Sequence, residues 1–147
     1  MKNKRIDMEK IALLAAAKEI AKKYNGKIIP FEHEGNHLIA IDSSKFVVAL
    51  TICDTNNRRC IKIEEILVNE GFRNLGIATD VINTFMKYAK ELNVAVGLWC
   101  KKENKIGYEF YKKLGFNHVD TINDYWFEYN QGEKHWTLEE VKEKKKH

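Results

Sequence analysis

The run IKIEEILV (residues 61–68) leads into GFRNLGIATDVINTFMKYAKEL (residues 71–92), and the sequence pattern changes between them from strand to helix. The first run is apolar and β-prone, whereas the second repeats its apolar residues at helical spacing. A helix that starts here leaves the N–H groups of its first turn without partners inside the helix, and the helix dipole adds to their positive potential. The joint between the two runs is therefore a candidate anion site.

Small side chains at this joint would let an anion reach the backbone. Gly76 and Ala78 leave room for a phosphate, and Arg73 brings a cation to its edge. The segment is not a Walker loop, because no Lys-Ser/Thr follows the glycine, and it is not a dinucleotide-binding fingerprint, because only one of the three glycines is present. A second interpretation is that Gly76 only permits a tight turn from strand to helix. This segment alone does not decide between the two.

The N-terminal half of the chain predicts one helix and a set of short strands. Helical spacing predicts a helix over residues 8–24, with Asp7 as its N-cap and Asn25-Gly26 as its stop. Four β-prone runs follow, and the short polar links between them indicate an antiparallel meander. These runs are KIIPF (27–31), HLIAID (37–42), KFVVALTIC (45–53) and CIKIEEILV (60–68).

The C-terminal half continues the alternation of strands and helices. After a helix over residues 76–92, the apolar run VAVGLWC (94–100) predicts a central strand that is buried on both faces. A helix over residues 104–114 ends at Gly115. The remaining predicted elements are closing strands at FNHVDT (116–121) and DYWFEY (124–129), and a short terminal helix with a capping box at Thr137 and Glu140.

Length, charge and cysteine content restrict the class of protein. The chain has 147 residues, of which 44% are hydrophobic, which suits one domain with a core of its own. Its 25 basic and 21 acidic residues are mixed along the chain, which argues against a nucleic-acid partner. We expect no membrane partner, since no apolar run is long enough to span a bilayer and the N-terminus lacks a signal-peptide core. Cys53, Cys60 and Cys100 favour reduced thiols in the cytoplasm. A homodimer is left open.

Two segments carry a family resemblance. Ile66 and Val68 match an L-x-V strand end, and Arg73, Gly76 and Ala78 match the loop pattern Q/R-x-x-G-x-G/A. Downstream, NKIGYEFYKKLGF (104–116) matches N-x-x-A-x-x-F-Y-x-K-x-G-F, except that glycine replaces the alanine. Together, over about residues 46–129, the chain resembles the GNAT superfamily of acyl-CoA-dependent N-acetyltransferases.

This resemblance implies an α/β fold with a mixed, mostly antiparallel central sheet and helices on both faces. We expect a single domain over residues 1–147. It would comprise an N-terminal helix region (1–26), an acetyl-CoA-binding core (about 46–129), and a short C-terminal helix with a lysine-rich tail (131–147).

The resemblance also implies acetyl-CoA as cosubstrate and an amine as acceptor. In this family the central strands diverge, and the pantetheine arm pairs with the strand that here contains residues 64–68. Backbone N–H groups near Leu67 and Val68 would stabilise the oxyanion. The expected cofactor-binding residues are Ile66, Leu67, Val68, Arg73, Asn74, Leu75, Gly76, Ile77, Ala78, Asn104 and Tyr111.

Two residues are candidates for proton transfer. Tyr111 is the implied general acid, because a phenol pKa of about 10 is close to that of an alkyl thiol; the alternative is a packed aromatic ring. Glu64 is the candidate base, since it shares strand parity with Ile66 and Val68, whereas Glu65 points to the other face. Water or an amine that arrives deprotonated could replace it.

Other constellations are weaker. His33, His37, Cys53 and Cys60 are ligand types for zinc, but their spacing does not favour a site, and we expect no metal. A covalent acyl-cysteine at Cys100 is less favoured than a buried, inert thiol. Trp99, Trp126 and Trp136 are interpreted first as core residues and second as an aromatic platform for a base or an arylamine.

The sequence leaves the acceptor open between polyamines, aminoglycosides, small metabolites and proteins. The main prediction is an N-acetyltransferase that moves the acetyl group of acetyl-CoA to a primary amine by direct attack. An acyl-CoA-binding regulatory module without turnover is the alternative.

Overall fold

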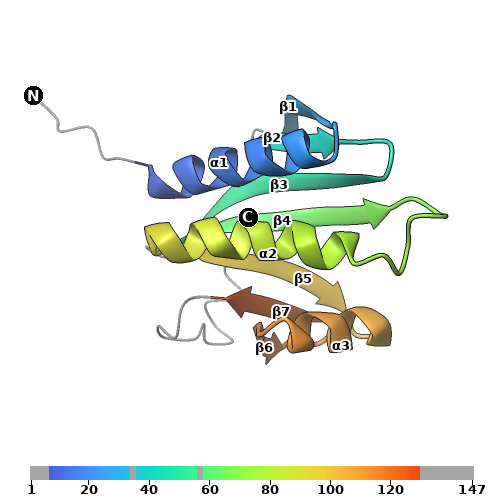
Figure 1. Ribbon diagram of the computed structural model, residues 1–147. Helices are drawn as coiled ribbons and strands as arrows, with labels where there is room; N and C mark the ends of the chain where they lie inside the picture. The colour runs from blue at the N-terminus through green and yellow to red at the C-terminus, as the bar shows by residue number, and fades with distance from the viewer. Residues whose placement is uncertain (1–6, 34–35, 56–57, 130–147) are drawn as a thin grey trace, which may run out of the picture.

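The computed structural model describes residues 7–33, 36–55 and 58–129 (Figure 1). Every element predicted within these residues is present, with ends that differ by one or two residues at most. The predicted terminal helix around Thr137 and Glu140 lies outside the described residues. In chain order the elements are α1 (Met8–Lys23), β1 (Lys27–His33), β2 (Asn36–Asp42), β3 (Phe46–Thr55), β4 (Arg58–Val68), α2 (Ile77–Leu92), β5 (Ala95–Lys101), α3 (Lys105–Lys113), β6 (Asn117–Asp120) and β7 (Asp124–Tyr129).

The strands form one seven-stranded sheet in the order β1-β2-β3-β4-β5-β7-β6. Strands β1 to β4 make the predicted antiparallel meander. Strand β5 then pairs with β4 in parallel, and β7 pairs antiparallel with both β5 and β6. The mixed, mostly antiparallel sheet that the resemblance implied is therefore confirmed.

The three described helices lie on the same face of the sheet, in front of it in Figure 1. This differs from the expectation of helices on both faces. The cause is the topology: the crossovers β4–α2–β5 and β5–α3–β6 advance across the sheet in the same direction. Since such crossovers are almost always right-handed, they place α2 and α3 on one face. We call this the helix face and the other the reverse face.

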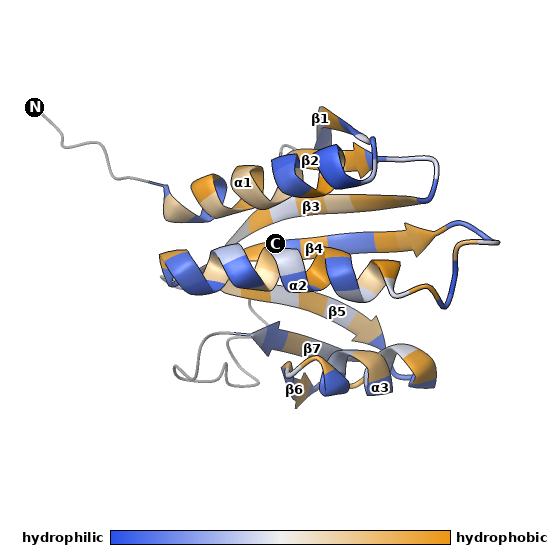
Figure 2. Cartoon of the chain, viewed as in Figure 1, coloured by the Kyte–Doolittle hydropathy of each residue, from blue (hydrophilic) through white to orange (hydrophobic). Residues whose placement is uncertain are grey.

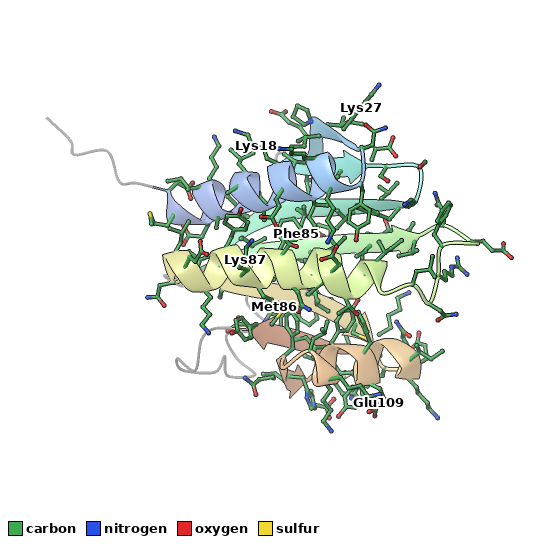
Figure 3. The ribbon with its side chains drawn as sticks, in the orientation of Figure 1. Lys18, Lys27, Phe85, Met86, Lys87 and Glu109 are labelled. Carbon is green, nitrogen blue, oxygen red and sulfur yellow. The ribbon has the colours of Figure 1, made fainter. Side chains whose placement is uncertain are left out.

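The main core lies between the helices and the helix face. Buried positions recur along α2 at helical spacing, and Figure 2 shows hydrophilic segments between its apolar ones. Phe85, labelled in Figure 3, is fully buried against this core. The strands supply alternate residues to it, such as Phe46, Val48 and Leu50 of β3. These contacts fix α2 on the sheet and with it the joint that precedes the helix.

Strand β5 is buried on both faces over its centre, as predicted. Val96, Leu98 and Cys100 belong to the helix-face core. On the reverse face Gly97 is covered by Trp126, and a Cβ built on Gly97 would lie 2.2 Å from a ring carbon of Trp126. Only glycine fits at this position without displacing the indole.

Within the described residues, the structure has no helix that is both long and apolar enough to cross a lipid bilayer.

Candidate active site

The joint between β4 and α2 has the backbone geometry of a tight loop. Gly71, Asn74 and Gly76 all have positive φ, at 93°, 64° and 78°. Gly76 is the N-cap of α2 and has no side chain to offer as a cap. The N–H groups of residues 77–79 therefore point out of the helix start without acceptors inside the helix. This is the arrangement that binds anions at helix N-termini.

Gly76 is required for its backbone angle. A Cβ built there meets no atom within 4 Å, but its φ of 78° lies in the left-handed region that other residues rarely adopt. The two sequence interpretations of this glycine are thus compatible. The glycine permits the tight turn, and the tight turn exposes the first N–H groups of α2.

A cavity of about 340 Å³ opens at this joint. Its lining includes many of the residues predicted to bind the cosubstrate, together with three outside that prediction: Phe72, Thr79 and Phe110. The lining residues are Val68, Phe72, Arg73, Asn74, Gly76, Ile77, Ala78, Thr79 and Phe110. Phe110 belongs to the second motif, so the cavity brings the two motif segments together. Leu75 does not line it and exposes 67% of its surface.

Arg73 is tied to the end of the strand. Its Nε donates a hydrogen bond of 3.0 Å to the carbonyl oxygen of Val68. This bond uses one of the five N–H groups of the guanidinium, and the remaining four stay available to an anion. The side chain is exposed, which suits a cation that meets a ligand at the rim of the cavity.

Strands β4 and β5 part beside this cavity. Within the described residues their ladder runs from Cys60↔Ala95 to Ile63↔Leu98 and includes no pair from residues 64–68. On its other edge, the same segment pairs with β3 as far as Phe46↔Val68. The edge of residues 64–68 that faces β5 thus lies along a split, as the resemblance implied. Peptide-like groups of a ligand could pair with such an edge.

A β-bulge at Glu64 overturns the predicted face of this residue. In the β3–β4 ladder Leu50 pairs with Ile63, and Ala49 pairs with Glu65, so Glu64 is the extra residue. The bulge interrupts the alternation of the strand. Ile63 and Ile66 consequently both face the helix-face core. Glu64 does not share the face of Ile66 and Val68.

Both carboxylates lie on the reverse face. Glu65 pairs with Ala49, which alternates with the core residues of β3. Glu64 forms an ion pair with Lys62, with 3.1 Å between Oε1 and Nζ. Lys62 lies two residues after Cys60 and so shares its face, and Cys60 packs with Trp126 on the reverse face. The bulge therefore brings two adjacent carboxylates to that face at the start of the split.

Tyr111 lies half-buried on the helix face, where α3 packs on the sheet. Its ring centroid is 5.5 Å from that of Phe127 and 6.1 Å from that of Phe116. Burial, and to a smaller extent the neighbouring thiol of Cys100, raises the pKa of the Tyr111 hydroxyl above its usual value. The hydroxyl is therefore protonated at neutral pH.

The Cys100 thiol is buried, with Sγ 3.6 Å from the carbonyl oxygen of Lys101. Burial first, and the charge of Asp124 second, raise the pKa of this thiol. A thiol with a raised pKa is a poor nucleophile at neutral pH. The structure favours the inert-thiol interpretation over an acyl-cysteine.

Asn104 caps α3, and this explains the glycine that departs from the second motif. The Oδ1 of Asn104 accepts a hydrogen bond of 3.0 Å from the N–H of Gly107. A Cβ built on Gly107 would lie 2.5 Å from the Asn104 Nδ2. With alanine at position 107, the Asn104 side chain could not remain where it is.

The tryptophan and zinc interpretations of the sequence concern residues that the structure describes only in part. Trp126 is fully buried, and its ring centroid lies 5.0 Å from that of Trp99 with the planes tilted by 60°, which supports the core interpretation for these two rings. Trp136 and the side chains of His33, His37 and Cys53 lie outside the described part of the chain. Among the side chains that are described, no three potential ligands gather into a group that could hold a metal ion.

A model of the acetyltransferase (GNAT) family matches residues 9–116. The chain belongs to this family. Over 82 residues, it is 39% identical to an uncharacterized N-acetyltransferase of Methanocaldococcus jannaschii, an alignment that covers 51% of the chain and 36% of that relative. This GNAT chain thus matches only about a third of the length of the curated relative.

Solved structures share the fold. NAA60 of Arabidopsis thaliana in complex with acetyl-CoA superposes with a TM-score of 0.52 at 18% identity, over 79% of this chain and 94% of that one. PaiA N-acetyltransferase of Thermoplasma acidophilum in complex with coenzyme A gives a TM-score of 0.51 at 17% identity, over 80% and 69% of the two chains. At these identities the likeness concerns the fold. The GNAT fold implied by the two sequence motifs is confirmed.

Proposed function

We propose that this GNAT chain transfers the acetyl group of acetyl-CoA to a primary amine by direct attack. One observation carries the proposal: the anion-binding start of α2 lies where the β4–β5 ladder ends. A ligand with a pyrophosphate at one end and an extended, amide-containing arm at the other fits both features at once. Acetyl-CoA has this chemistry, and two proteins of the same fold have been solved with acetyl-CoA or coenzyme A.

The pyrophosphate would bind at the N–H groups of residues 77–79, with Arg73 at its edge. The pantetheine arm would lie in the split and pair with the backbone of residues 64–68. Phe72 and Phe110 would supply apolar walls of the cavity. In this arrangement the thioester ends between the two central strands, within reach of both faces of the sheet.

The reaction forms a C–N bond and breaks the C–S bond of the thioester. The amine attacks the carbonyl carbon, and N–H groups near Leu67 and Val68 stabilise the oxyanion. As the tetrahedral intermediate collapses, the CoA thiolate takes a proton from the Tyr111 hydroxyl. Burial keeps the Tyr111 hydroxyl protonated at neutral pH, but the raised pKa also makes proton transfer to the thiolate less favourable than from an unshifted phenol.

The amine would approach from the reverse face. Glu64 lies there at the start of the split and would accept the proton that the attacking amine loses, directly or through water. Lys62 holds this carboxylate at 3.1 Å and restricts its position. The acceptor is an amine of a small molecule or of a protein; NAA60, which has the same fold, has also been solved with a bisubstrate analogue.

The decisive experiment measures binding and turnover on one preparation. Isothermal titration with acetyl-CoA tests the cosubstrate, and thiol release with a panel of polyamines, aminoglycosides, amino acids and peptides tests the transfer. We expect saturable binding, and thiol release with at least one amine class. Binding without thiol release for any amine would instead support a regulatory module without turnover.

A further inference from the structure

Helices α1 and α2 are joined by two reciprocal clusters, each made of a Lys-Tyr pair on one helix and a carboxylate on the other. In the first, Lys23 Nζ lies 2.6 Å from the Asp80 carboxylate, and the Tyr24 hydroxyl donates to the same oxygen. We call Lys23, Tyr24 and Asp80 the loop clamp. Its counterpart lies further along both helices.

In that second cluster, Lys87 Nζ and the Tyr88 hydroxyl each lie 2.9 Å from Glu19 Oε1. We call Glu19, Lys87 and Tyr88 the distal clamp, and Figure 3 labels Lys87 where α2 faces α1. The two clamps use the same side-chain types and join the same two helices. They differ in their distance along α2 from the anion site.

The loop clamp acts on the first turn of α2. The N–H of Asp80 donates to the carbonyl oxygen of Gly76 at 3.0 Å, which closes that turn. The residues between them, 77–79, line the cavity. The Asp80 carboxylate thus lies within one helical turn of the N–H groups that would bind a pyrophosphate, and the α1 end holds it from the side.

Tyr24 also contacts the structure around the other end of the loop. Its ring packs edge-on against Phe46, with 5.2 Å between centroids, and Phe46 pairs with Val68 at the end of β4. Lys45 Nζ lies 5.9 Å from the Tyr24 ring centroid and 5.8 Å from that of Phe72 in the loop. One tyrosine therefore links the start of α2, the end of β4 and the Phe72 wall of the cavity.

The charges of the loop clamp suit this place. A carboxylate in the first turn of α2 would repel an anionic ligand at the helix start if it were not offset. Burial would raise the Asp80 pKa, but hydrogen bonds from Lys23 and Tyr24 outweigh it and hold that pKa below its ordinary value. Burial and the bond to Asp80 raise the pKa of Tyr24 to about 12. The hydroxyl therefore donates and the carboxylate stays charged throughout the neutral range.

We propose that Tyr24 is a positioning residue for the pyrophosphate of acetyl-CoA, and that it acts through Asp80 on the first turn of α2. The inference rests on the proposed function, because it assumes that the phosphate groups bind at this turn. It adds a residue from the end of α1, outside both motifs, to the apparatus that places the cosubstrate. The distal clamp supplies a matched control.

The test compares Tyr24→Phe with Tyr88→Phe. Each change removes one hydroxyl that joins α1 to α2, so thermal denaturation should show comparable small losses in Tm. Titration with acetyl-CoA should show a Kd about 3- to 10-fold higher for Tyr24→Phe, the loss expected for one hydrogen bond, and no change for Tyr88→Phe. The KM for acetyl-CoA should rise in parallel while kcat stays near the wild-type value.

A donor without the pyrophosphate separates positioning from general loosening. With S-acetylpantetheine, the KM of Tyr24→Phe should equal that of the wild type. Because Tyr24 acts through Asp80, the double variant with Asp80→Ala should bind acetyl-CoA no more weakly than Asp80→Ala alone. Additive losses would mean that Tyr24 acts by another route and would overturn the inference.

The outcomes also distinguish the inference from the function on which it rests. If the wild type binds acetyl-CoA and both tyrosine variants bind it equally well, the inference is wrong and the proposed function stands. Equal losses with acetyl-CoA and S-acetylpantetheine would likewise overturn the inference alone. If the wild type does not bind acetyl-CoA, the proposed function is wrong, and the inference fails with it.

Discussion

Glu64 and Lys62 project from the same face of β4, with 3.1 Å between the carboxylate and the ammonium group. Ordinary strand alternation places these two side chains together, since residues i and i+2 share a face. The β-bulge at Glu64 lies where β4 leaves β5. The bulge brings Glu65 to the same face. The two neighbouring carboxylates therefore share a face and differ only in their position relative to the split.

We expect Glu64→Gln to lower kcat by about 100-fold, since a positioned general base contributes roughly that much. Glu65→Gln should change kcat little, because Glu65 pairs across the strand with Ala49, whereas Glu64 directly follows the last β4–β5 pair. Steady-state kinetics with saturating acetyl-CoA provides the comparison. Equal losses for the two variants would show that the carboxylates act together or only hold the acceptor.

Tyr111→Phe should lower turnover by about 10²- to 10⁴-fold with little change in the Kd of acetyl-CoA, because a general acid acts only as the C–S bond breaks. The ring contacts with Phe127 and Phe116 remain in the variant. Tyr108→Phe is the control on the same helix, since the Tyr108 ring also contacts Phe127 but its hydroxyl lies 3.4 Å from His118 Nε2. Full turnover by Tyr111→Phe would assign the protonation to water.

Gly76→Ala should destabilise the protein by about 1–2 kcal/mol, the cost of placing an L-residue in the left-handed region. It should also weaken acetyl-CoA binding, because relief of that strain moves the first turn of α2. Gly76→Asn is the control, since asparagine tolerates this region and Asn74 already adopts it two residues earlier. Chemical denaturation and titration check the two effects; equal behaviour of both variants would remove backbone strain as the explanation.

Asn104 and Gly107 should be energetically coupled. Asn104→Ala removes the N-cap of α3 and should cost about 1 kcal/mol of unfolding free energy. In a Gly107→Ala background the cap is already displaced, because the new Cβ takes the place of the Asn104 amide. A double-mutant cycle by chemical denaturation should therefore show a much smaller cost for the second change. Strict additivity would contradict the cap geometry.

The loop clamp should contribute to the pH dependence of protein stability in acid. The pKa of Asp80 is lower in the folded protein than its ordinary value of 3.8. Its contribution to stability is therefore complete above that value and is lost as the pH falls through the lower, folded-state pKa. Asp80→Asn should flatten the acid limb of the stability curve below about pH 4. An unchanged acid limb would mean that Asp80 titrates alike in the folded and unfolded chain.

The loop and the order of elements could be predicted from sequence because they depend on local chemistry. Gly76 and the apolar spacing of α2 act within a few residues. The bulge at Glu64 could not be predicted, since residues 61–68 contain no glycine and the register is set by β3. The Tyr24–Asp80 bond joins positions 56 residues apart and leaves no local pattern. The common face of α2 and α3 follows from crossover handedness, which acts only once the strand order is known.

Within the described residues, only four residue pairs join β4 to β5, and these are the only two neighbouring strands there that run parallel. Antiparallel pairing joins strands β1 to β4 on one side and strands β5, β7 and β6 on the other. The β4–β5 ladder is therefore a seam between two antiparallel blocks. We expect the seam to open more readily than either block, and its amides to exchange with solvent faster than those of β3. A ligand that pairs along residues 64–68 would lengthen the seam and slow that exchange. Ligand binding would therefore be detected first as slower amide exchange along the seam, at residues that the ligand does not touch.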